Sequence, residues 1–156
     1  LGDVYKRQHV GELIDHIDGN TICEADHLFA TRLWQNNSKV HFDINAREDK
    51  KRLIYGGHII SLVRALSFNG LENAQLIVGI NGGTHANPAF AEDTIYCWSE
   101  VLEKIDLNVR NIAALRLRSV GTKEKNHSMK VKSDDGRYLP TTVLDFDYWV
   151  LVPREL

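Results

Sequence analysis

The sequence predicts an α+β domain in which an antiparallel sheet wraps around one long central helix. The helix is expected within residues 52–69, where apolar side chains would face nearly every direction around the axis, as is typical of a buried helix. Three later runs, residues 93–102, 114–120 and 142–153, alternate apolar and polar residues, which predicts strands with one buried face. A helix that precedes such a set of strands favours a sheet curled around that helix.

The composition is that of an ordinary globular domain. The chain has 156 residues, of which 43% are hydrophobic and 26% charged, with a formal net charge of −2. Because the charge is nearly balanced, neither nucleic acid nor a membrane surface is expected as a partner. Cys23 and Cys97 have no metal-ligand or redox spacing, and we find no targeting or transmembrane motif, so a cytoplasmic protein with reduced thiols is expected.

The first eight residues, LGDVYKRQ, contain no initiator Met and do not share the pattern that follows them. We interpret residues 1–8 as a non-native segment derived from a sequencing adapter, and we exclude them from the fold. The domain is predicted to occupy residues 9–156. The chain is then expected to be a fragment whose N-terminal portion is missing.

A strand and a helix are expected before the central helix. The strand is predicted over residues 12–22 and is broken at residues 18–20, whose composition favours a turn. The helix is predicted to begin at Thr21 or Glu24 and to end at Trp34. Its apolar side is expected to consist of Leu28, Phe29, Leu33 and Trp34.

The central helix has an unusual start. Its polar side chains recur every three positions, at His58, Ser61, Arg64 and Ser67. Gly56 and Gly57 leave the first backbone N–H groups without side-chain cover, and these groups carry the positive end of the helix dipole. Such a place stabilises a negative charge that develops on an oxygen atom. Asn69 and Gly70 suit a left-handed cap at the other end.

The regions that flank the alternating strands are less regular. Residues 74–80 form a continuous apolar run, which is predicted to be a strand that ends at residues 81–83. In residues 93–102, the face predicted to be buried carries Ile95, Cys97, Ser99 and Val101. Residues 123–140 are polar and are predicted to form a long mobile hairpin loop.

The order and patterning of these elements predict the hot-dog architecture. Arg116 and Arg118 are expected to face Asp145 and Asp147 across two neighbouring strands. A sheet that wraps around one helix leaves sheet edges and one face that need cover, so we expect a second hot-dog unit as a partner.

Five runs carry a resemblance that covers nearly the whole predicted domain. TRLWQNNSKVHFD (residues 31–43), RLIYGGHIISLVRALSFNG (52–70) and NGGTHANPAFAEDTI (81–95) resemble the MaoC-like hot-dog enoyl-CoA hydratases. The last two of these, with LRLRSVGTKE (115–124) and VLDFDYWVLVPR (143–154), look most like the C-terminal half of the family members that hydrate mesaconyl-CoA.

The resemblance implies reversible addition of water to an enoyl-CoA thioester, most specifically to mesaconyl-CoA, which gives β-methylmalyl-CoA. Two alternatives stay open: a hydratase for (R)-specific short-chain enoyl-CoA or itaconyl-CoA, and a non-catalytic hot-dog half that binds acyl-CoA and completes the dimer. The partners implied are the acyl-CoA thioester and a second hot-dog unit, either the missing N-terminal half or a second copy. No metal or cofactor is expected, because coenzyme A is part of the substrate and the seven histidines lack metal-ligand spacing.

Hydration of an enoyl thioester needs a group that moves protons and donors for the thioester oxygen. His41 is the candidate for proton transfer, although a loop histidine bonded to the backbone is the alternative. Gly56 and Gly57 are the candidate backbone donors, or they only allow close packing. Asn36 stands where the family pattern has an acidic residue, and an amide cannot be a base, so Asn36 is expected at most to orient water or substrate. Acids that could substitute are Asp43 and Glu24.

The expected substrate also carries a free carboxylate, which calls for a cation or a strong hydrogen-bond donor in the site. Arg64, Arg52 and His58 are the candidates for this role. Tyr55 and His58 flank the start of the central helix and could touch the substrate or only fill the helix entrance. His85 is expected to be a turn residue rather than a ligand of the substrate.

Overall fold

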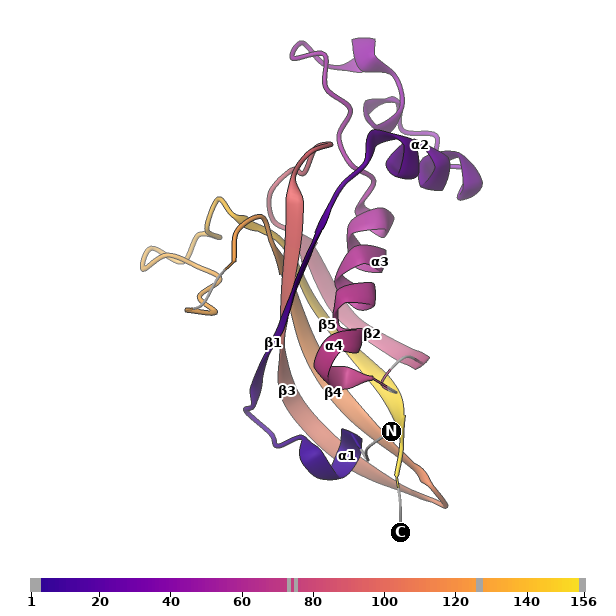
Figure 1. Cartoon of the computed structure of the whole chain (residues 1–156), viewed down its shortest axis with the longest axis vertical. Coiled ribbons are helices and arrows are strands. Elements are labelled where there is room, and N and C mark those ends of the chain that lie inside the picture. Colours follow the sequence, from indigo (N-terminus) through magenta and orange to yellow (C-terminus); the bar gives the residue numbers. More distant parts are fainter. Residues whose placement is uncertain (1–3, 73, 75, 126–127, 155–156) are drawn as a thin grey trace.

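The computed structural model describes residues 4–72, 74, 76–125 and 128–154 (Figure 1). Its helices are α1 (Val4–Arg7), α2 (Glu24–Leu33), α3 (Gly56–Leu66) and α4 (Phe68–Leu71), with two short 3-10 helices, η1 (Lys39–His41) and η2 (Ile44–Ala46). Its strands are β1 (Leu13–Thr21), β2 (Leu76–His85), β3 (Thr94–Val109), β4 (Ile112–Thr122) and β5 (Thr142–Pro153). The strands form one antiparallel sheet in the order β1-β3-β4-β5-β2, and this sheet curls along α3, so the predicted architecture is confirmed.

The alternating strands bury the faces that their sequences predict. The inward residues of β3 are no more than 2% exposed; they are Ile95, Cys97, Ser99 and Val101. On the outer face, Arg118 Nε donates to Asp145 at 2.8 Å and Arg116 Nη2 donates to Asp147 at 2.7 Å, as expected from the pairing of β4 with β5. Partly exposed ion pairs of this kind contribute about 1 kcal/mol or less each, so they support the register rather than drive the fold.

Two strand boundaries differ from the prediction. β1 runs through residues 18–20 with an irregular register between Asp15 and Gly19, where the ring of Tyr96 leaves no room for a side chain on Gly19. β2 does not end at Gly82 and Gly83 but continues to His85, because β5 supplies a pairing partner for each of these residues. The expected turns at both places are wrong, since pairing in the sheet overrides the local preference of glycine for turns. Residue 75, within the run expected as a strand, lies outside the described residues.

The orientation of α2 also differs from the prediction. The residues that α2 buries completely are His27 and Thr31, whereas Phe29, Leu33 and Trp34 on its expected apolar side are each more than 60% exposed. Figure 1 shows α2 beyond the N-terminal end of α3, away from the sheet. Hydrogen bonds of His27, described below, decide which side of α2 faces inward.

α3 is buried on one side in the described chain. Ile59 and Val63 are at most 3% exposed, while Ser61 and Ala65 face outward, so the expected burial on nearly all sides is wrong for this chain alone. The helix ends at Leu66, and Gly70 takes the left-handed backbone conformation expected after it (φ +105°).

Arg64 and Ser67, part of the expected polar stripe, are buried near the C-terminal end of α3. The guanidinium of Arg64 donates to Ser67 Oγ at 3.1 Å, to the hydroxyl of Tyr148 at 2.7 Å and to the Ala74 carbonyl at 2.6 Å. These bonds join the end of α3 to β5 and to the chain that leads into β2. Each buried polar partner is thereby satisfied.

Two remaining segments pack on this frame. In the N-terminal segment, Val4 is buried and Lys104 Nζ donates to the carbonyls of Tyr5 and Gln8. Residues 1–3 lie outside the described residues. The non-native origin of residues 1–8 stays a prediction. Of the expected loop at 123–140, residues 126–127 lie outside the description, and the rest includes a bridge between Lys132 and Tyr138. Among the described residues, no helix has the length and apolar character needed to cross a membrane.

Replacing Arg64 with Met should lower the free energy of unfolding by about 3 kcal/mol, because the Tyr148 hydroxyl and the Ala74 carbonyl lose a buried donor. Urea unfolding followed by circular dichroism measures this change. Ser61→Ala, on the exposed side of the same helix, should change stability by less than about 0.5 kcal/mol. Equal stability of Arg64→Met and the parent would contradict the anchoring role.

Candidate active site

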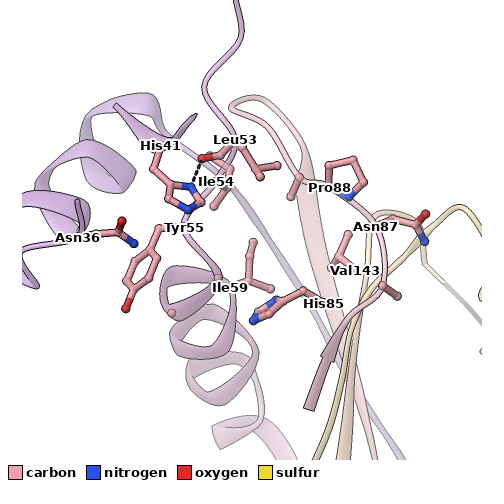
Figure 2. A pocket seen from close by; sticks show the side chains of 14 residues that line it. Asn36, His41, Leu53, Ile54, Tyr55, Ile59, His85, Asn87, Pro88 and Val143 are labelled. Carbon is pink, nitrogen blue, oxygen red and sulfur yellow. Dashed lines mark hydrogen bonds between the residues drawn. The ribbon is translucent and has the colours of Figure 1, made fainter. Parts of the chain in front are cut away.

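A pocket of about 530 Å³ opens beside the N-terminus of α3. Its walls come from η1, from the chain that leads into α3, from the end of β2 and from the loop that follows β2 (Figure 2). The lining residues are Asn36, His41, Leu53, Ile54, Tyr55, Gly56, Gly57, Ile59, His85, Ala86, Asn87, Pro88, Ala89 and Val143.

His41 lies at the end of η1 and has one ring nitrogen fixed by the backbone. Its Nδ1 donates to the Leu53 carbonyl at 2.8 Å, and a carbonyl oxygen can only accept. In the neutral ring, Nε2 is therefore the nitrogen without a proton, and it can accept one from a molecule in the pocket. Figure 2 shows the bond to Leu53 and the second nitrogen turned toward the start of α3.

His27 holds η1 and the start of α3 together. It is 0% exposed; its Nε2 donates to the His41 carbonyl at 2.9 Å, and its Nδ1 accepts from the Tyr55 amide at 3.2 Å. One ring nitrogen must donate and the other must accept, so His27 is neutral with its proton on Nε2. Burial lowers the pKa of His27, which favours this neutral form. The sequence offers one signal for this role in retrospect, because His27 and Thr31 are one helical turn apart and share the buried side.

The two glycines at the start of α3 lie under two rings. A Cβ on Gly56 would lie 2.6 Å from Nε2 of His85, and a Cβ on Gly57 would lie 2.6 Å from the ring of Tyr55. Among the described residues, the amides of Gly56 and Gly57 have no hydrogen-bond acceptor, whereas the His58 amide donates to the Tyr55 carbonyl. Two free donors at the positive end of a helix therefore line the pocket that His41 also lines.

Asn36 contributes a donor to the same pocket. Its Oδ1 accepts from the Ser38 amide at 2.9 Å, which leaves the side-chain nitrogen as the group that can face a ligand (Figure 2). The two expected substitutes for an acid at this position lie outside the lining: Asp43 accepts from the Asn45 amide, and Glu24 pairs with Arg52. The described lining residues thus include no carboxylate.

Sequence reasoning and structure agree on only part of the substrate-binding set. The structure brings Tyr55 into the pocket lining. Arg52 lies outside the pocket lining and donates to Glu24 and to the Phe42 carbonyl. Arg64 is buried near the C-terminal end of α3, where it donates to Tyr148. His58 is not a lining residue either, and its ring centroid lies 6.5 Å from that of His27.

His85 is the lining residue whose placement the sequence misjudged. The expectation that it lies in a turn is wrong, because His85 is the last residue of β2 and pairs with Leu144 of β5. The local sequence predicts a turn at this position, because the pair Gly82-Gly83 before His85 is typical of turns. Among the described residues, no cluster of three or more His, Cys, Asp or Glu side chains could hold a metal ion.

No family model matches the chain, but solved structures do. A MaoC domain protein dehydratase from Chloroflexus aurantiacus superposes with a TM-score of 0.92 and 51% identity, covering 97% of this chain and 45% of that one. A double hotdog protein from Mycobacterium tuberculosis (TM-score 0.71, 15% identity, 97% of this chain and 44% of that one) and an (R)-hydratase from Pseudomonas aeruginosa (0.61, 18%, 97% and 90%) share the fold. Over nearly its whole length, the chain is thus similar to a MaoC domain dehydratase, and it shares the hot-dog fold.

Two curated relatives are similar over nearly the whole chain. Mesaconyl-CoA hydratase of Cereibacter sphaeroides is 59% identical over 145 residues, and β-methylmalyl-CoA dehydratase of Chloroflexus aurantiacus is 54% identical over 150 residues. Each comparison covers 93% of this chain but only 42% and 43% of the relatives, respectively. The chain therefore spans less than half the length of the curated relatives that it matches.

The buried state of His27 predicts a pH dependence of stability. The folded pKa of His27 is lowered from 6.5, so the unfolded chain takes up a proton first as the pH falls. Its contribution to stability is full above pH 6.5 and decreases as the pH falls from there toward the folded pKa. Tm should be lower at pH 5 than at pH 7.5, and the difference should be smaller in His27→Gln. An identical pH dependence of Tm in both proteins would contradict the buried neutral state.

Proposed function

We propose that this domain contributes an active site to a hydro-lyase that adds water reversibly to an enoyl-CoA thioester, converting mesaconyl-CoA to β-methylmalyl-CoA. One observation carries the proposal: the free Nε2 of His41 and the free amides of Gly56 and Gly57 line a single pocket. This combination meets both needs of the reaction, proton transfer and stabilisation of charge on the thioester oxygen. The two curated relatives bear the names of enzymes for the forward and the reverse reaction.

The pocket suggests how the addition proceeds. The thioester oxygen accepts from the Gly56 or Gly57 amide, which stabilises the enolate-like charge that develops there. His41 Nε2 removes a proton from water, and the hydroxide oxygen forms a bond to the carbon distant from the thioester. The proton then passes from His41 to the carbon next to the thioester, so that water is added across the double bond and His41 returns to its neutral form.

Asn36 has a supporting role in this mechanism. Because its Oδ1 is held by the Ser38 amide, its side-chain nitrogen can donate to the attacking water or to the acyl group. The described pocket lining offers no carboxylate as a second base, and we assign both proton transfers to His41, whose Nε2 is the ring nitrogen without a proton.

A second function is favoured by the same residue. Asn36 stands where the family resemblance places an acid, which is the change expected in a non-catalytic half that binds acyl-CoA and completes a dimer. The intact His41 and the free glycine amides favour the catalytic assignment over this one. Short-chain enoyl-CoA or itaconyl-CoA remains the alternative substrate.

A second hot-dog unit is the proposed partner. β2 lies at one edge of the sheet, and its Leu76, Val78 and Ile80 are each more than 50% exposed. Apolar side chains at the end of α2 are also exposed; they are Phe29, Leu33 and Trp34. Apolar side chains that are exposed on an edge strand, and on a helix outside the sheet, are typical of an interface. We further propose a cytoplasmic setting with no cofactor beyond the coenzyme A of the substrate; both cysteines are free thiols.

His41→Ala in the full-length protein should lower kcat for mesaconyl-CoA by about 100-fold or more, because the group that moves both protons is lost. Binding of butyryl-CoA, measured by calorimetry, should change little. His9→Ala, which replaces an exposed histidine outside the pocket, serves as the control. Unchanged kcat in His41→Ala would rule out the assigned role.

Asn36→Asp should keep the fold and retain part of the activity, since the new carboxylate can still accept from the Ser38 amide. Its charge should repel the free carboxylate of mesaconyl-CoA, so KM should rise more for mesaconyl-CoA than for crotonyl-CoA, which lacks that group. Asn37→Asp adds the same charge at an exposed neighbouring position and should have little effect. If neither substrate responds to Asn36→Asp, Asn36 does not contact the substrate.

A further inference from the structure

The side chain of His85 lines one wall of the pocket and makes no hydrogen bond to another described residue. Figure 2 shows its ring at the start of α3, below Asn87 and Val143 and across the pocket from His41. The ring rests directly on Gly56, where any side chain would displace it. Among the described residues, the ring of His85 has no hydrogen-bond partner, although both of its nitrogens are polar. The fold therefore leaves this imidazole available to a ligand.

The other polar groups near this wall are already engaged. The side-chain nitrogen of Asn87 donates to the Leu139 carbonyl at 2.9 Å and to the Thr142 carbonyl at 2.7 Å. The described lining residues include no Lys or Arg. A ligand that carries an anionic group on this side would thus meet His85 as the available side-chain donor.

We propose that His85 binds the free carboxylate of a dicarboxylic enoyl-CoA and thereby selects it over a monocarboxylic one. This inference rests on the proposed function and deepens it. In mesaconyl-CoA the carboxylate is attached to the carbon that water attacks. We place the thioester oxygen at the α3 amides and that carbon near His41, and we assign the carboxylate to the wall that carries His85, which lies across the pocket from His41.

The chemistry of His85 suits this task. Partial burial lowers the pKa of His85, so the empty pocket holds a neutral ring whose N–H can donate. A hydrogen bond from this ring to a carboxylate is charge-assisted and stronger than one between neutral groups. The adjacent positive end of α3 attracts the same negative group.

The experiment compares two substrates on two variants of the full-length protein. In His85→Phe, which keeps a ring of similar size, kcat/KM for mesaconyl-CoA should fall about 10- to 100-fold, mostly through KM, while the fall for crotonyl-CoA is much smaller. His85→Gln, which restores a donor, should recover part of the loss. Equal losses for both substrates, or no loss for either, would overturn the inference.

A binding measurement separates this inference from the proposed function. The parent should bind succinyl-CoA more tightly than butyryl-CoA, and His85→Phe should remove the difference, with circular dichroism confirming that the variant is folded. If the parent hydrates neither enoyl-CoA, the proposed function fails, yet a His85-dependent preference for succinyl-CoA would still support carboxylate recognition. If the parent binds both saturated thioesters equally, the inference is wrong whatever the catalytic result.

Discussion

The site depends on where α3 lies, and a buried hydrogen-bonding side chain near each end of the helix fixes that position. Near the C-terminal end, Arg64 joins the helix to β5 through the Tyr148 hydroxyl and to the Ala74 carbonyl. At the N-terminal end, His27 accepts from the Tyr55 amide and donates to the carbonyl of His41. Because the same ring holds both the helix start and His41, the candidate donors and the candidate base keep a constant relation to each other.

This arrangement gives the Gly56-Gly57 pair a physical reason. A helix start that is to present free amides to a ligand cannot be capped by its own side chains, and here Tyr55, the residue before the helix, provides no side-chain cap. The rings of His85 and Tyr55 occupy the space that side chains at Gly56 and Gly57 would need. The glycines thus serve two purposes at once: they leave the amides open, and they let two rings define the walls of the pocket.

The sequence predicts the antiparallel sheet and the central helix from local periodicity, and it predicts much of the pocket from the two motifs that carry His41 and Gly56. It does not reveal His27, whose partners are backbone groups 14 and 28 residues away. It misplaces His85, because pairing with β5 keeps Gly82 and Gly83 in a strand although their local preference is for a turn. The prediction for α2 is wrong because helical periodicity shows that one side of a helix is apolar but not which surface covers that side.

The central claim is that His41 and the amides at the start of α3 act on one bound enoyl thioester. A crystal structure of the full-length protein with butyryl-CoA, a saturated thioester that cannot be hydrated, tests it most directly. The account predicts that the thioester oxygen lies within hydrogen-bond distance of the Gly56 or Gly57 amide, with Nε2 of His41 facing the two carbons that follow it. A thioester bound outside this pocket, or a His41 ring whose Nε2 faces away from the acyl chain, would contradict the account.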